Sequence, residues 1–253
     1  MTKEQFVTQL IHHLEGIFPQ EEYRIRSDIF VKNNSTKRYG LIIQKRTEQV
    51  HPTIYVDDFF EDYLHKKITL SEISERIQQI MKGVSEQVER YSKFSIEWPD
   101  CQSKVTYRLI SMERNKELLS CIPHIPFLNL AIVFSLVYHV SEQGLESICI
   151  TQELQDKWKV STKELFQQSE KNTIRLFEPH IETMENVLYN YLGYKPCIEE
   201  QIPSIYIFSN KMGINGATVL IYKDLIHNFA KKMQSNLYII PSSIHECVTR
   251  FAA

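Results

Sequence analysis

The sequence predicts an α+β fold in which mixed or antiparallel sheets are covered by helices. Segments with a helical spacing of apolar residues alternate with short β-like runs along the chain. Hydrophobic residues make up 43% and charged residues 24% of the 253 positions, as is typical of globular proteins. A break at Trp98-Pro99-Asp100 suggests two closely packed subdomains, residues 1–98 and 99–253, although one continuous domain also fits this pattern.

The first half predicts a small sheet with helices packed on it. Apolar residues recur at helical spacing over 3–18, behind Thr2 as the N-cap. Two further helices are expected to cover one face of the sheet, one capped by Asp57 and Asp58 and one beginning near Thr69. The β-like runs that form the antiparallel sheet are 23–31, 39–44 and 53–56.

The second half alternates between helical and strand-like segments. The amphipathic segment 105–119 is expected to be helical, and the apolar run 122–140 to be a buried strand or a core helix. Ser161 and Glu164 have capping-box spacing and begin a helix that extends toward Leu176. The remaining predicted strands are 147–151, 205–208, 217–222 and 236–240, and the remaining helices are 181–192, 224–233 and one that opens at Ser242 or Ser243.

Composition disfavours several classes of function. The 29 basic residues nearly balance the 31 acidic ones, so no global field directs the chain to nucleic acid or anionic lipid, and a dedicated nucleic-acid binder is disfavoured. Gly occurs only seven times, and neither G-x-G-x-x-G nor a Walker-type motif is present, which excludes nucleotide binding by those loops.

The cysteines and the apolar segments indicate which compartment to expect and whether to expect a cofactor. The five cysteines form no C-x-x-C pair and no zinc spacing, so we expect free thiols in a reducing cytoplasm, with no metal cluster and no cofactor. The N-terminus lacks the apolar region of a signal peptide, and prolines and histidines interrupt the run 122–140. We therefore expect no export and no membrane span, while the oligomeric state stays open.

Five sequence blocks resemble a known protein family. They are HPTIYVDDFFEDY (51–63), NKELLSCIPHIPFLNLAIVF (115–134), WKVSTKELFQQSEKNT (158–173), NKMGINGATVLIY (210–222) and NLYIIPSSIHE (236–246). In this order they resemble the bacterial family catalogued as domain of unknown function 5688. The resemblance implies a bacterial, cytosolic α+β protein and brings no catalytic residues with it.

Two turns are candidate sites for a small anionic ligand. Ser242, Ser243, His245 and Glu246 follow an apolar strand where a helix is expected to open, and a helix N-terminus offers unpaired N–H groups to an anion. The same spacing from Ser243 to Glu246 also fits an ordinary capping box. The second candidate, in the segment 210–216, is Lys211 with Asn215. An ordinary hairpin turn is the favoured explanation of this segment, and the two turns are expected to approach each other.

Charged residues supply two more candidates. Asp58 and Asp62 share a helical face and are a weak candidate for Mg²⁺ or Ca²⁺, although acidic residues are common at helix N-termini. A basic run with interleaved aromatics fits a single-stranded nucleic-acid surface, unless alternation buries the aromatics and solvates the charges. Its members are Arg24, Arg26, Lys32, Lys37, Arg38, Lys45 and Arg46, with Tyr23, Phe30 and Tyr39.

These observations lead to three hypotheses about function. The first is a non-enzymatic intracellular binding or regulatory module that engages a protein partner or a small anionic ligand near the two turns. The second is a metal-dependent hydrolase or nuclease-like enzyme that uses His245 and Glu246 or the carboxylates between Asp57 and Asp62. The third is an accessory nucleic-acid-binding protein, whose affinity would fall steeply with salt.

Overall fold

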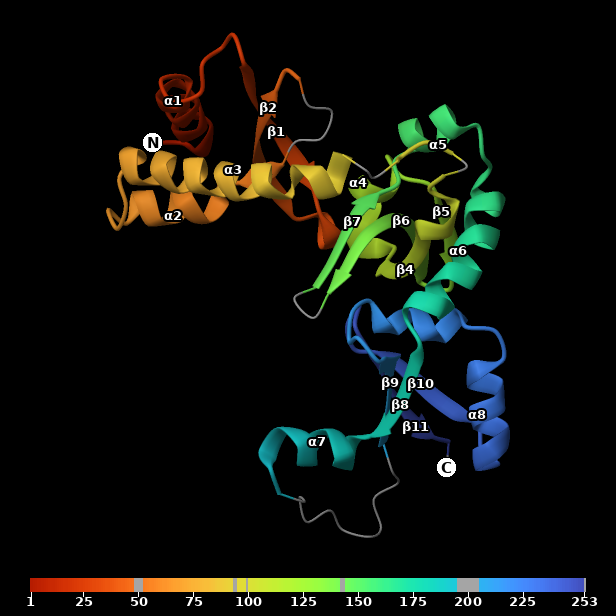
Figure 1. The fold of residues 1–253 in the computed structure, drawn as a ribbon. Helices are drawn as coiled ribbons and strands as arrows, with labels where there is room; N and C mark the ends of the chain where they lie inside the picture. The colour runs from red at the N-terminus through yellow and green to blue at the C-terminus, as the bar shows by residue number, and fades with distance from the viewer. Residues whose placement is uncertain (48–51, 93–94, 99, 142–143, 195–204, 253) are drawn as a thin grey trace. The chain divides into compact units, whose positions relative to one another are not determined.

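The computed structural model describes residues 1–47, 52–92, 95–98, 100–141, 144–194 and 205–252 (Figure 1). The chain divides into two compact units, residues 1–95 and 96–253, each with its own helices and antiparallel sheet pairing. This arrangement confirms the α+β fold predicted from the sequence. In the described ranges, no helix is both long enough and apolar enough to cross a membrane.

The first unit contains one three-stranded antiparallel sheet in the order β1-β2-β3. A capping box between Thr2 and Gln5 begins the first helix, as predicted for Thr2. Asp57 and Asp58 lie in the first turn of a helix but do not cap it, so that prediction was wrong. The elements are α1 (Lys3–Glu15), β1 (Tyr23–Val31), η1 (Asn33–Ser35), β2 (Lys37–Lys45), β3 (Thr53–Tyr55), α2 (Asp57–Leu64) and α3 (Leu70–Ser92).

The two faces of this sheet differ in what they contact. Leu41 and Ile43 of β2 and Ile54 of β3 lie on the inner face, in one core cluster with residues of α1, α2 and α3. Because side chains alternate along a strand, Arg38, Gly40 and the other even-numbered residues of β2 belong to the outer face. The helical residues of the inner core include Phe6, Leu10, Leu14, Phe60, Ile73 and Ile77.

The second unit begins with a sheet in the order β4-β6-β5, in which β7 also pairs with β6. The expected helix over 105–119 was wrong, because residues 105–111 form a strand that is almost wholly buried against β6 and α6. Thr173 of α6 accepts a hydrogen bond from the Tyr107 amide at 3.0 Å. The elements are η2 (Gln102–Lys104), β4 (Val105–Ser111), η3 (Glu113–Asn115), α4 (Lys116–Leu119), β5 (His124–Phe127), β6 (Leu130–Ser141), β7 (Gly144–Cys149), α5 (Gln152–Trp158) and α6 (Thr162–Leu176).

A four-stranded antiparallel sheet in the order β10-β11-β9-β8 completes the second unit. Of the predicted strand 217–222, residues 217–221 lie in a 3-10 helix, and the helix predicted at Ser242 or Ser243 is a hairpin turn instead. Phe229 packs its ring edge-on against Tyr206 and Phe208 on one face of the sheet. The elements are β8 (Pro179–Thr183), α7 (Met184–Leu192), β9 (Ile205–Asn210), η4 (Gly216–Ile221), α8 (Leu225–Met233), β10 (Leu237–Pro241) and β11 (Cys247–Phe251).

Candidate functional site: the outer face of the N-terminal sheet

Strand register brings basic and aromatic residues together on the outer face of β1-β2-β3. Phe30 pairs with Arg38 across β1 and β2, and Gly40 pairs with Tyr55 across β2 and β3. Arg24 and Arg26 lie on the same face of β1 as Phe30, because they are separated from it by even numbers of residues. We call the set Arg24, Arg26, Phe30, Lys32, Arg38 and Tyr55 the basic–aromatic face.

Gly40 allows the aromatic part of this face to form. A Cβ atom at Gly40 would lie 2.4 Å from Cε2 of Phe30 and 2.6 Å from Cγ2 of Thr53, so the Phe30 ring occupies the space above the glycine. The ring then meets Tyr55 edge-on, with 6.0 Å between the centroids and an interplanar angle of 89°. Glycine within a strand often marks such a close approach, here of an aromatic ring to the backbone.

Lys32 places a cation over this aromatic pair. Its Nζ atom lies 4.7 Å from the centroid of the Tyr55 ring and 5.9 Å from that of Phe30. Both distances are within the range of cation–π attraction, which favours a positive charge over the face of a ring. The face therefore combines ring surface with a positive charge held directly above it.

Arg24 and Arg26 extend the positive charge along β1. Both side chains are exposed, and neither has an acidic partner among the residues that the structure describes. Between residues 23 and 46 the sequence has seven basic residues and one acidic residue, Asp28. Asp28 has the same even spacing, so it lies between Arg26 and Phe30 on this face, and its carboxylate accepts a hydrogen bond from the Ile29 amide at 2.8 Å.

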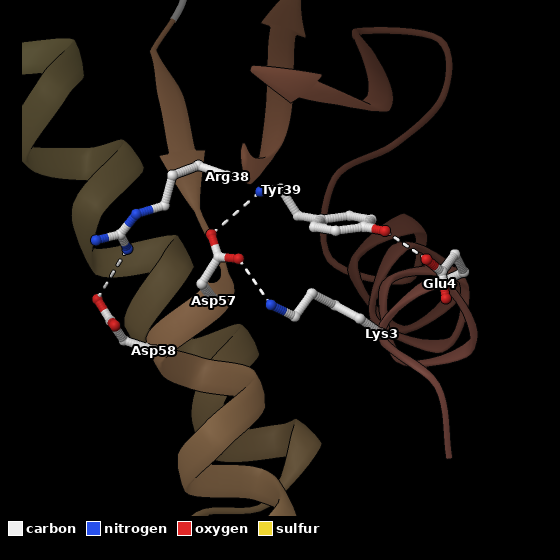
Figure 2. Close-up of polar contacts among 6 residues, drawn as sticks. All are labelled: Lys3, Glu4, Arg38, Tyr39, Asp57 and Asp58. Atoms are coloured by element: carbon white, nitrogen blue, oxygen red, sulfur yellow. Dashed lines mark hydrogen bonds and ion pairs between the residues drawn. The ribbon is translucent and has the colours of Figure 1, made fainter. Parts of the chain in front are cut away.

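Neighbouring residues of β2 point to opposite faces of the sheet (Figure 2). Arg38 extends toward Asp58 of α2, with 3.6 Å between the guanidinium and the carboxylate. Tyr39 extends the other way and donates its hydroxyl hydrogen to Glu4 of α1. This hydrogen bond lowers the pKa of the Glu4 carboxyl and raises that of the Tyr39 hydroxyl. Of the predicted aromatics, only Phe30 therefore belongs to the basic–aromatic face, and Tyr23 and Tyr39 pack on the inner core.

Asp57, in the first turn of α2, connects this helix to β2 and to α1 (Figure 2). Its carboxylate accepts hydrogen bonds from Lys3 Nζ at 2.9 Å and from the Tyr39 amide at 3.1 Å. The Asp57 side chain is 14% exposed, so the pair with Lys3 is shielded from much of the solvent. This contact fixes the strand that carries Arg38 and Gly40.

The acidic candidates for metal binding face cations instead of one another. Asp58 contacts Arg38, and Asp62 pairs with Lys67 at 3.1 Å. Within the described residues, no group of three or more His, Cys, Asp or Glu side chains is arranged to hold a metal ion. The geometry therefore gives no support to a metal site at Asp58 and Asp62.

The two predicted anion-binding turns lie next to each other in the second unit, as expected. The Asn215 amide donates to Nδ1 of His245 at 3.2 Å, and the Ser209 hydroxyl donates to the His245 carbonyl at 2.7 Å. Gly216 makes this approach feasible, because a Cβ there would lie 2.1 Å from the His245 carbonyl oxygen. The contact joins the β10–β11 hairpin to the segment after β9.

The polar groups of these turns have partners of their own. Lys211 forms an ion pair with Glu178 at 2.8 Å, and Ser242 donates to the Glu246 carboxylate at 3.3 Å. The Ser243 hydroxyl accepts from the His245 amide at 2.9 Å, which is the geometry of a turn and not of a helix N-terminus. This hairpin therefore offers no helix N-terminus whose amides could attract an anion, and the Lys211 ammonium group is already paired with Glu178.

Sequence reasoning missed Tyr55 as a member of the basic–aromatic face and Gly40 as the residue that leaves room for the Phe30 ring. The alternation of Arg24, Arg26 and Phe30 along β1 could be read from the sequence. Tyr55 joins them only through the β2–β3 register, which depends on long-range pairing. A glycine inside the predicted strand 39–44 was the available signal for a close approach at that point.

Comparison with known proteins identifies the family of this chain. A family model described as "Family of unknown function (DUF5688)" matches residues 3–251. No curated protein and no solved structure matches the chain. The match leaves the function to be argued from the residues themselves.

Proposed function

The chain belongs to the family of unknown function DUF5688, and from its own residues we propose that it is a nucleic-acid-binding module. Its ligand would be a single-stranded nucleic acid held on the basic–aromatic face. The observation that carries this proposal is the presence of two exposed arginines, without an acidic partner among the described residues, on the same sheet face as a partly exposed pair of aromatic rings.

The basic residues supply what a phosphate backbone requires. Arg24 and Arg26 are separated by two strand positions, which is about 7 Å along one face. Since neither has a carboxylate partner in the described part of the chain, no internal ion pair must be broken when a phosphate binds. Lys32 adds a third cation close to the rings.

The aromatic residues supply what the bases require. Proteins that bind single strands combine a positive groove with rings on which bases stack, and this stacking tolerates any sequence. Phe30 and Tyr55 are both only partly buried, on the same face as the arginines. An isolated phosphate or a carboxylate would use the cations but would leave the rings without a role.

Fluorescence anisotropy with short labelled single-stranded DNA and RNA tests this function. The wild-type protein should bind, and replacing both Arg24 and Arg26 by Gln should weaken binding by about tenfold at moderate salt. Losing two phosphate contacts should also reduce the slope of log K against log salt by about 1.4. The matched control is Lys231→Gln with Lys232→Gln, which removes the same charge from exposed positions of α8 and should leave binding unchanged.

A third variant separates stacking from charge. Phe30→Leu with Tyr55→Leu should weaken single-strand binding by about tenfold without changing the salt slope, because base stacking releases no counterions. Absence of single-strand binding by the wild type, or equal losses in the arginine variant and the α8 control, would refute the proposal.

A further inference from the structure

Strand β10 forms an open edge of the four-stranded sheet in the second unit. The strand order β10-β11-β9-β8 places it outermost, with β11 as its only partner among the described residues. An edge strand presents unpaired N–H and C=O groups that can pair with another strand. The edge is therefore a surface with a defined hydrogen-bonding chemistry.

The hydrogen-bond pattern identifies the backbone groups that point outward. The Ala252 amide donates to the Asn236 carbonyl at 2.8 Å, so the carbonyl of residue 236 faces β11. Successive residues of a strand direct their backbone groups to opposite sides. Leu237 and Ile239 therefore present both their N–H and C=O groups to the open edge, and Pro241 presents only its carbonyl.

β10 lacks the charges that protect other edges of this protein. The edge strand β8 contains His180 and Glu182, which contact each other, and β1 contains Arg24 and Arg26. None of the five residues of β10 is charged. Tyr238 and Ile240 expose 64% and 61% of their surface on the face opposite Phe229, so the edge is apolar as well as unpaired.

We propose that this edge pairs with β10 of a second copy of the chain, in antiparallel orientation about a two-fold axis at Ile239. This register pairs Ile239 with the partner's Ile239, Tyr238 with the partner's Ile240, and Leu237 with the partner's Pro241. All five residues are then paired, and the two four-stranded sheets become one continuous sheet. A two-fold contact of this kind requires a self-complementary patch, which β10 provides.

Side chains and charges fit this pairing. The outward backbone groups of Ile239 make it a hydrogen-bonded pair, so Tyr238 and the partner's Ile240 form the adjacent, closer non-hydrogen-bonded pair. Aromatic and β-branched residues opposite each other stabilise antiparallel strands. Arg250 pairs with Tyr238 one strand inward, so two copies of it lie about 14 Å apart, which exceeds the screening length at physiological salt.

Pro241 limits how far the hydrogen-bonded pairing between the two strands can extend. Lacking an N–H group, it leaves the carbonyl of the partner's Leu237 without a donor at each end of the pairing, as a proline does on an edge strand. A five-residue pairing also buries little surface compared with an obligate interface. The dimer should therefore form reversibly and depend on protein concentration.

Sedimentation velocity from micromolar to hundreds of micromolar protein tests the proposal. The wild type should shift from monomer to dimer, whereas Tyr238→Lys with Ile240→Lys should remain monomeric because each lysine faces a lysine of the partner. The same charges placed by Leu128→Lys with Tyr191→Lys, at two exposed apolar positions elsewhere, should leave the dimer intact. Persistence of the dimer in the β10 variant, or a wild type that stays monomeric throughout, would overturn the proposal.

Two further measurements identify the register. Mixing the lysine variant with Tyr238→Glu and Ile240→Glu should restore a mixed dimer, because opposite charges then face each other across the axis; no mixed dimer would reject this register. In the wild type, hydrogen exchange at the Leu237 and Ile239 amides should slow at high protein concentration. The Tyr238 and Ile240 amides, which point toward β11, should be protected at every concentration.

Discussion

Replacing Gly40 by Ala tests whether the basic–aromatic face is packed as described. The new Cβ would lie 2.4 Å from Cε2 of Phe30 and 2.6 Å from Cγ2 of Thr53, both far closer than carbon atoms approach. The backbone around Gly40 cannot yield, because β1 and β3 pair with it on both sides. We therefore expect the Phe30 ring to leave its place above β2 and to lose its edge-on contact with Tyr55.

The size and sign of the change in unfolding free energy depend on Phe30 and Thr53. Overpacking of this kind costs about 1–3 kcal/mol, while an alanine within a strand is intrinsically favoured over glycine by about 0.5–1 kcal/mol. The net result in the wild-type background is a destabilisation of about 1–2 kcal/mol. With Phe30→Ala and Thr53→Ser already in place, the same substitution should stabilise the strand.

Hydrogen exchange followed by mass spectrometry on the full chain measures this effect locally. The opening free energy of amides in β1–β3 should fall in Gly40→Ala and rise when the substitution is made in the Phe30→Ala, Thr53→Ser background. Amides of the second unit serve as the internal reference. The packing argument fails if Gly40→Ala is neutral or stabilising with Phe30 and Thr53 present.

Three other predictions concern single charges and thiols. Asp57→Asn should destabilise the first unit by about 1–2 kcal/mol in the same exchange measurement, because it removes the shielded ion pair with Lys3. Asp58→Asn should change stability little, because the Asp58 side chain is 89% exposed. Equal effects of the two substitutions would refute this distinction. Burial raises the pKa of the Cys247 thiol to about 12, so iodoacetamide at mildly alkaline pH should modify exposed Cys121 first. Because an unfolded cysteine ionises near 9.0 and native Cys247 does not, stability should decrease as pH rises from there toward 12, and Cys247→Ala should remove that part of the dependence.

Local signals in the sequence predicted the fold well wherever neighbouring residues determine the structure. The N-cap at Thr2 and the capping box at Ser161 with Glu164 form as expected, since each needs only residues a few positions apart. The run 23–31 is β1 with the same bounds, because its neighbours in the sheet follow directly in the chain. The predictions at Tyr39 and Thr53 correspond to β2 and β3, with small shifts at their ends.

Long-range pairing explains the predictions that were wrong. Residues 105–111 are buried on both faces, so they lack the alternation that distinguishes a strand from a helix. Ser243 and Glu246 have the spacing of a capping box, but pairing of β11 with β9 and β10 turns this segment into a hairpin. Cys197, one of the five predicted free thiols, lies outside the described residues.

The net charge of the chain disfavoured nucleic acid as a ligand, because the basic and acidic residues of the whole chain nearly cancel. On the outer face, β1 carries Arg24 and Arg26 together with one carboxylate, that of Asp28, while Asp57 is engaged by Lys3 next to the inner core. At physiological salt the screening length is about 8 Å, so a phosphate on the outer face responds to charges within that distance and not to the chain total. Asp58 contacts Arg38 but is 89% exposed, and Arg24 and Arg26 have no acidic partner in the described part of the chain. The local arrangement of charge, and not the overall balance, is therefore the relevant quantity for binding on this face.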